Sequence, residues 1–282
     1  MQQLSLETLQ FIDEKKREYE EKYTIRIYMW LVRKSFLRGL GRKSSDLDIA
    51  FIFDDLGEQK HKILFERSKR RVEIQCWNIR DILSVIVENK QRASKDRFFS
   101  LYYENQELKH YILDYYNGFY CGFDSGLAGD YYQFWERCGN SFKNMYEPLV
   151  VARMCYNDLK AGQERLEKGY WISLNEYLNA VWSGLAGCHM LSGGTPGKVE
   201  IIDLIGKYAD SNDRDELFST VHYFKKTIQK QSNYGNMLNW SGVLKKLLDK
   251  LEKKICMYEV QSVNVEQNIL IVRNYLEENK RS

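Results

Sequence analysis

The spacing of apolar residues changes along the chain and separates a region with strands from a region with helices only. From Leu6 to Lys22 the apolar positions recur at helical spacing, which predicts a first helix capped by Ser5. Apolar and polar residues then alternate in three segments, and this alternation is typical of strands. The predicted strands cover 25–31, 46–54 and 71–77, and a further helix, capped by Asn78, is predicted over 79–90.

After residue 90 the alternation disappears, and every later segment with regular spacing predicts a helix. Only 2 prolines interrupt the chain, so long helices can form. The predicted helices cover 105–118, 141–161, 173–191, 199–209, 213–230, 239–260 and 264–279. The layout therefore predicts an α+β fold, with a small mixed-sheet domain over 1–118 and a helical C-terminal domain over 119–282.

Charge and cysteine content narrow the class of protein. Lys and Arg number 42 and Asp and Glu number 39, a net charge of +3 that is too balanced for a nucleic-acid coat or a membrane-surface binder. The 6 cysteines form no Cys-x-x-Cys pair, so we expect free thiols in a reducing compartment. No apolar stretch reaches the roughly 20 residues that span a bilayer. We predict a cytoplasmic protein with no membrane partner and no DNA-specific motif.

One pair of carboxylates is the first candidate for chemistry. Asp46 and Asp48 lie two residues apart on the second predicted strand, which places both on its polar face. Like charges this close repel each other unless a cation lies between them, and oxygen ligands suit Mg²⁺. Glu73, on the polar face of the third predicted strand, completes a set that supports two metal ions. A D-x-D pair alone is also typical of a strand face beside solvent.

A basic turn precedes these carboxylates. Ser35 directly follows the first predicted strand and opens a predicted short helix, whose free N–H groups would face an anion. Five positive charges lie in the same turn and make it a predicted site for a triphosphate. They belong to Arg33, Lys34, Arg38, Arg42 and Lys43.

These residues resemble the nucleotidyltransferase superfamily, which includes DNA polymerase beta. The superfamily is marked by Gly-Ser, a short spacer, a D-x-D pair and a third carboxylate on a later strand, and here Ser35 precedes Asp46 by 11 positions. The stretch 30–80 is similar to the predicted nucleotidyltransferases associated with RNA repair. KSFLRG and SSDLDIAFIF stand in place of their GSRAWG and DSDYDVRFIY, and Glu73 takes the place of their later carboxylate. Lys34 stands where they have glycine.

The resemblance implies a Mg²⁺-dependent enzyme that moves a nucleoside monophosphate from an NTP, expected to be ATP, to a hydroxyl acceptor. Residues 1–118 would be the nucleotidyltransferase domain. Asp46, Asp48 and Glu73 would hold two Mg²⁺ ions and form the catalytic set. The acceptor that it suggests is an RNA end, and an antibiotic, as in aminoglycoside nucleotidyltransferases, or a protein hydroxyl are the alternatives. The nucleotide-binding residues that it implies are Ser35, Lys34, Arg38, Arg42 and Lys168. Lys34 also leaves open a nucleotide-binding or scaffolding protein with a degraded site.

Overall fold

The protein forms two compact units, and each is described by itself. The sheet unit comprises residues 1–34, 46–146 and 263–282, and the helical unit comprises residues 35–45 and 147–262. The computed structural model describes residues 6–32, 34–42, 45–55, 64–67, 72–78, 126–127, 148–194, 200–226, 237–259 and 265–278.

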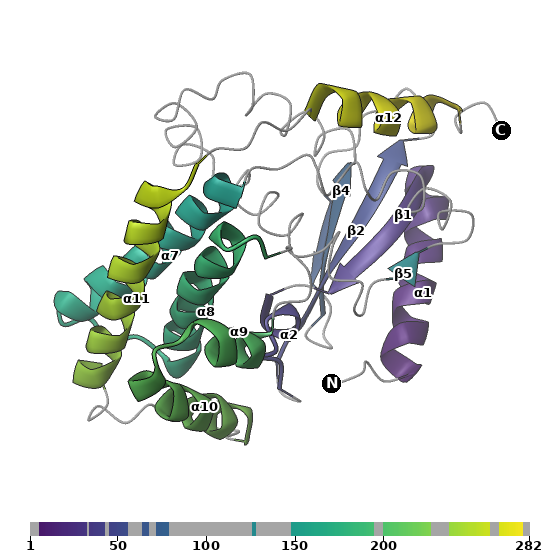
Figure 1. The fold of residues 1–282 in the computed structure, drawn as a ribbon. Coiled ribbons are helices and arrows are strands. Elements are labelled where there is room, and N and C mark those ends of the chain that lie inside the picture. Colours follow the sequence, from purple (N-terminus) through teal and green to yellow (C-terminus); the bar gives the residue numbers. More distant parts are fainter. Residues whose placement is uncertain are drawn as a thin grey trace. The chain divides into compact units, whose positions relative to one another are not determined.

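A mixed five-stranded sheet forms the core of the sheet unit (Figure 1). Its central strand, β2, pairs in parallel with β4 and antiparallel with β1, and the order across the sheet is β3-β4-β2-β1-β5. The shorter strands β3 and β5 pair antiparallel with β4 and β1. The strands are β1 (Ile25–Val32), β2 (Leu47–Asp55), β3 (Leu64–Arg67), β4 (Val72–Asn78) and β5 (Gly126–Leu127).

Helix α1 (Leu6–Tyr23) packs against this sheet through its apolar side. The ring of Tyr19 meets the fully buried ring of Phe51 edge to face, with centroids 5.7 Å apart. The Glu20 carboxylate accepts a hydrogen bond from the Ile27 N–H at 2.8 Å, where a bulge interrupts the pairing of β1 with β2. Helix α1 thus supplies a side-chain acceptor for a strand N–H beside the bulge.

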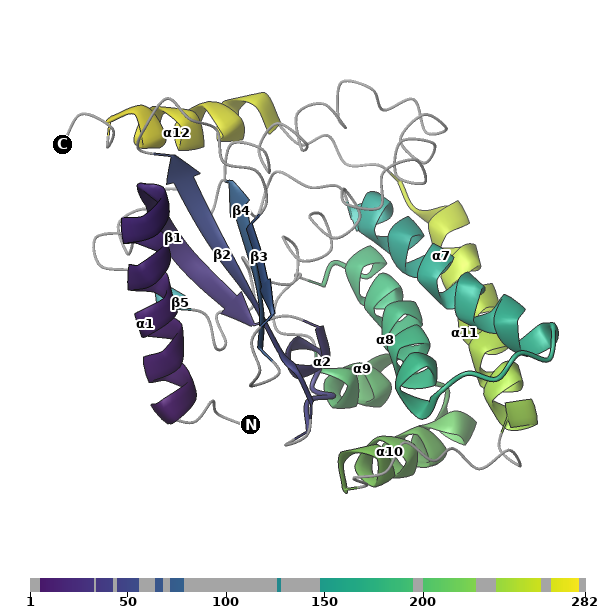
Figure 2. The ribbon, with the colours of Figure 1, turned by 180° about the vertical axis from the view of Figure 1, so that it is seen from behind.

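The helical unit is built around α8 (Figure 2), which is buried on nearly all sides because α7 and α11 pack against it and against each other. The rings of Tyr177 and Trp240 stack at 4.4 Å between α8 and α11. Burial, with Glu216 and Asp213 nearby, raises the pKa of Tyr177, so its hydroxyl stays neutral. The helices are α2 (Lys34–Leu37), α7 (Pro148–Glu167), α8 (Leu174–Leu191), α9 (Ile201–Tyr208), α10 (Ser211–Lys226) and α11 (Met237–Met257), while α12 (Val265–Glu278) belongs to the sheet unit.

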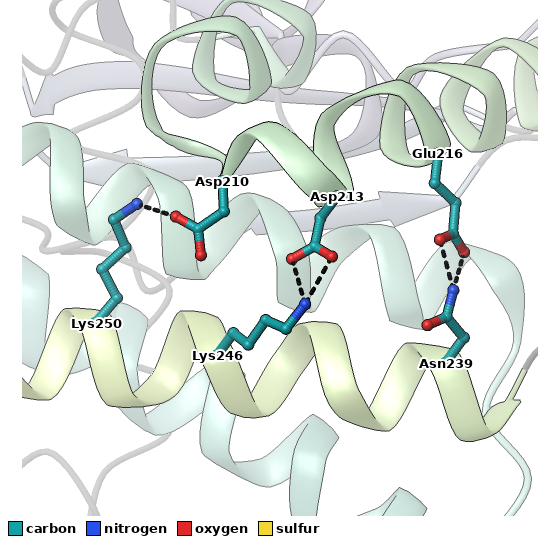
Figure 3. Close-up of polar contacts among 6 residues, drawn as sticks. All are labelled: Asp210, Asp213, Glu216, Asn239, Lys246 and Lys250. Carbon is teal, nitrogen blue, oxygen red and sulfur yellow. Dashed lines mark hydrogen bonds and ion pairs between the residues drawn. The ribbon is translucent and has the colours of Figure 1, made fainter.

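A row of polar contacts joins α10 and the residue before it to α11 (Figure 3). Lys250 Nζ lies 2.7 Å from an oxygen of Asp210, and Lys246 Nζ lies 2.8 and 3.0 Å from the two oxygens of Asp213. One turn further along, the Asn239 amide donates to the Glu216 carboxylate. These contacts are exposed, so we expect them to fix the register of α10 on α11 rather than to contribute much free energy.

The α+β fold class and its mixed sheet are confirmed. The three predicted strands form, as do the helices predicted from 141 onward, with ends shifted by a few residues. Strand β3 was not predicted, because four residues between polar neighbours carry too short an alternation. The helices predicted over 79–90 and 105–118 lie outside the described residues, and so does the predicted domain boundary at 118. In the described part of the chain, no helix has the length and apolar character needed to cross a membrane.

A capping box at the start of α8 gives a pH-dependent stability. The Ser173 hydroxyl accepts from the Glu176 N–H at 3.2 Å, and the Glu176 carboxylate accepts from the Ser173 N–H at 2.7 Å. Burial alone would raise the pKa of Glu176, but hydrogen bonds from Ser173 and Arg165 outweigh it and lower the pKa. A carboxyl with a pKa lowered by folding stabilises the fold above its unfolded pKa, and this contribution is lost as pH falls through the folded pKa.

We therefore expect Glu176→Gln to destabilise the helical unit by about 0.5 kcal/mol at neutral pH, a small value because the carboxylate is half-exposed. The difference in Tm between wild type and variant should shrink as pH falls below about 4, the ordinary range of a glutamate pKa. Thermal unfolding followed by circular dichroism at several pH values measures this. The exposed Asp215→Asn on α10 is the control, and a Tm difference independent of pH would contradict the prediction.

Candidate functional site

Two of the predicted catalytic carboxylates lie side by side on the central strands of the sheet. Asp48 on β2 and Glu73 on β4 are direct partners in the parallel register. Neighbouring strands lie about 4.8 Å apart, and partner residues point to the same face, so the two carboxylates share one face of the sheet. The prediction that the Glu73 strand lies beside the D-x-D strand is confirmed.

Asp46 is placed differently from its two partners. It precedes the first residue of β2 and is exposed, whereas Asp48 lies inside the strand and is only 7 % exposed. Within the described ranges, no three Asp, Glu, His or Cys side chains lie close enough to form a metal-binding group. The structure thus brings Asp48 and Glu73 together and does not add Asp46 to them. The three-carboxylate metal site stays a prediction.

The alternative interpretation of the D-x-D pair, a polar strand face beside solvent, does not fit the burial of β2. Every residue of β2 from Asp48 to Asp54 is buried, on both faces of the strand. The physical reason is the position of β2, which has β4 on one side and β1 on the other in a covered sheet. Asp48 is therefore a carboxylate in a largely water-excluded place, where its charge interacts more strongly with neighbouring charges than on a surface.

Gln75 is a site residue that the sequence reasoning missed. Its Nε2 donates a hydrogen bond to Glu73 Oε1 at 3.1 Å, and both side chains lie on the same face of β4 because they are two residues apart. Glu73 is half-buried, and this bond restricts its rotamer. The signal was present in the sequence, since Gln75 belongs to the same alternation as Glu73.

The basic turn connects the last residue of β1 to the start of β2, which is the end of β2 that contains Asp48. Val32, the last residue of β1, pairs with Ile49, one residue after Asp48. The chain between the two strands therefore leaves and re-enters the sheet next to the Asp48–Glu73 pair. Within this segment α2 begins at Lys34, so Ser35 lies inside the first turn of the helix, and the short helix predicted there is present.

The side chains of the other predicted nucleotide-binding residues are distributed along the helical unit. The Arg38 guanidinium lies over the ring of Trp182, with its carbon 4.6 Å from the centroid, and that of Arg42 lies 4.3 Å from the centroid of Phe224. Lys168 is exposed at the end of α7. The division into units places Ser35 with these three residues and Lys34 with the carboxylates. Their roles in binding a nucleotide stay predictions.

The residues at the carboxylate pair fit a magnesium ion by their chemistry. Asp48 and Glu73 offer only oxygen ligands, which Mg²⁺ prefers over nitrogen or sulfur. In such sites Mg²⁺ takes its remaining ligands from water and substrate phosphates. Two adjacent carboxylates on one face also favour a cation between them, because it relieves their mutual repulsion. Asp48 and Glu73 are therefore the residues that would hold the ion.

Comparisons with known proteins give a distant likeness to solved structures. No family model and no curated protein matches the chain. Among solved structures, it is similar to the crystal structure of a nucleotidyltransferase-like protein from Exiguobacterium sibiricum 255-15, with 13 % identity over 96 % of this chain and 80 % of that chain. The TM-score is 0.26, which is too low to show a shared fold, so this likeness carries no argument about function.

Proposed function

We propose that the protein is a Mg²⁺-dependent nucleotidyltransferase that transfers a nucleoside monophosphate from an NTP to a hydroxyl acceptor. The observation that carries the proposal is the register pairing of Asp48 with Glu73 on one face of the two neighbouring strands β2 and β4. The resemblance of the segments around Ser35, Asp48 and Glu73 to nucleotidyltransferase motifs supports the same reading.

In this reaction the acceptor oxygen forms a bond to the α-phosphorus of the NTP, and the bond from that phosphorus to pyrophosphate breaks. The acceptor hydroxyl gives up its proton to the surrounding water. When bound, Mg²⁺ neutralises charge on the phosphates and lowers the pKa of the attacking hydroxyl. Asp48 would hold the ion from a buried position and Glu73 would complete the pair on the acceptor side, while Gln75 donates a hydrogen bond to one Glu73 oxygen and so orients it.

The proposal has three more specific parts. The NTP is ATP, the hydroxyl acceptor is an RNA end, and a second Mg²⁺ ion is held with the help of Asp46. Thermal unfolding with ATP, with and without Mg²⁺, tests binding: we expect a rise in Tm that EDTA removes. Incubation with each labelled NTP and either total RNA or an aminoglycoside panel, with pyrophosphate release as the readout, identifies nucleotide and acceptor. Binding without pyrophosphate release from any acceptor would favour the nucleotide-binding protein with a degraded site.

Glu73→Gln is expected to lower kcat by at least about 30-fold while the Kd for ATP changes less than about threefold. Removing a group that acts mainly in the transition state lowers kcat and leaves ground-state binding of the substrate almost unchanged. Pyrophosphate release gives kcat, and the Tm shift as a function of ATP concentration gives Kd. Glu14→Gln, exposed on α1, is the matched control. An unchanged kcat with weakened ATP binding would contradict the acceptor-side role of Glu73.

A further inference from the structure

The turn that follows Ser35 is closed by its own backbone. The Leu40 N–H donates to the Ser35 carbonyl at 2.7 Å, and the Gly39 N–H donates to the Phe36 carbonyl at 3.1 Å. This is the Schellman pattern, which requires a left-handed residue after the helix, and Gly39 has a φ of +70°. Leu40 follows and is fully buried. The Ser35 carbonyl is thus bonded to the turn that follows it.

Arg38 attaches this turn to helices α8 and α9. Its Nη1 donates to Asn179 Oδ1 at 2.6 Å, and its guanidinium lies over Trp182. The Asn179 amide is oriented in turn by a bond from its Nδ2 to the Asn175 carbonyl at 2.8 Å. The Arg38 carbonyl accepts from the Ile201 N–H at 3.0 Å, at the start of α9, where no side chain caps the helix.

Arg42 makes a second attachment, on α10. Its guanidinium lies over the ring of Phe224, while its backbone N–H donates to the Ser45 hydroxyl at 3.0 Å and its carbonyl accepts from the Ser45 N–H at 2.9 Å. Both arginines therefore stack on aromatic rings in the helical unit. The Arg38 carbonyl also accepts the hydrogen bond from the N–H at the start of α9. A planar guanidinium suits stacking of this kind, and an ammonium group does not replace it.

We propose that Arg38 and Arg42 are positioning residues, which hold the Ser35 turn on the helical unit and so set the affinity of the protein for an NTP. This inference rests on the proposed function and gives these arginines a different role from the direct phosphate contact predicted from the sequence. A residue that binds phosphate directly acts mainly through its own charge, so removing one of its partners in the protein should cost less affinity than removing the residue itself. A positioning residue acts through its partners, so removing a partner has the same effect as removing the arginine.

A double-mutant cycle between Arg38 and Asn179 separates the two roles. Arg38→Lys keeps the charge and loses the stacking geometry, and Asn179→Ala removes the acceptor without touching the turn. We expect each to raise the Kd for ATP with Mg²⁺ by about tenfold (~1.4 kcal/mol) and the double variant to be no weaker than either one. Asn175→Ala, one turn earlier on α8, is the matched control and should change Kd less than about twofold.

The outcome that overturns the proposal is a normal Kd in Asn179→Ala, with the double variant no weaker than Arg38→Lys alone, or losses of the two single variants that add in the double variant. A second readout needs no nucleotide: hydrogen exchange of the Leu40 and Ile201 amides should accelerate in Arg38→Lys and Asn179→Ala. If the wild type binds no ATP, the proposed function fails, and the exchange rates alone decide whether Arg38 anchors the turn. Unchanged exchange in both variants refutes the anchoring, whatever the protein binds.

Discussion

Replacing Asp48 by asparagine is expected to abolish nucleotidyl transfer, with kcat lowered at least about 100-fold (~2.7 kcal/mol). Asparagine keeps the size of the side chain but removes the charge that would hold Mg²⁺ beside Glu73. The fold should survive, because the change also removes repulsion between two adjacent carboxylates and takes a charge out of a buried position. We therefore expect the Tm without metal to equal or exceed that of the wild type.

Pyrophosphate release and thermal unfolding of the same preparation measure both parts of this prediction. Asp13→Asn on the exposed side of α1 is the control for loss of one negative charge. An Asp48→Asn protein that retains near wild-type turnover would remove this residue from the metal site. A large fall in Tm would show instead that Asp48 serves the packing of the sheet.

Phe51→Ala should be the most damaging single change to the sheet unit, lowering its free energy of unfolding by about 3–5 kcal/mol. Phe51 lies in the middle of the central strand, is fully buried, and carries the contact between the sheet and Tyr19 of α1. Truncation leaves a cavity that neighbours in three strands and a helix cannot fill together. The free energy of opening from hydrogen exchange of the β2 amides measures the loss.

Phe51→Leu, which fills most of the same volume, should cost less than about 1.5 kcal/mol and is the matched control. A loss below about 1 kcal/mol in Phe51→Ala would mean that the sheet and α1 can close over the cavity. Such a result would identify the sheet as more deformable than its buried central strand indicates.

The elements with clear periodicity were predictable from the sequence, and those without it were not. The strand with Phe51 was visible because apolar residues alternate along it, and α8 was visible because the regular spacing of its residues predicts a helix over 173–191. Strands β3 and β5 escaped prediction because they are edge strands of four and two residues, held by their neighbours rather than by their own pattern. Local sequence carries no signal for such pairing.

The carboxylates of the candidate site could be predicted from the sequence, but some of the contacts around them could not. The pairing of Asp48 with Glu73 follows from two strands with acidic residues near their starts. The burial of Asp48 had a signal too, since Ala50 and Ile52 on the same face are apolar and mark a strand covered on both sides. The partner of Arg38 had none, because Asn179 is 141 positions away and only the folded chain brings them together.

The two units are interleaved in the order in which the ribosome makes them. The segment 35–45 is synthesised between two strands of the sheet unit, yet its partners on α8, α9 and α10 emerge more than a hundred residues later. Helix α12, which belongs to the sheet unit, follows the whole of 147–262. Neither unit can therefore be completed before most of the other has left the ribosome, and no fragment made by a single cut between the units contains the whole sheet unit.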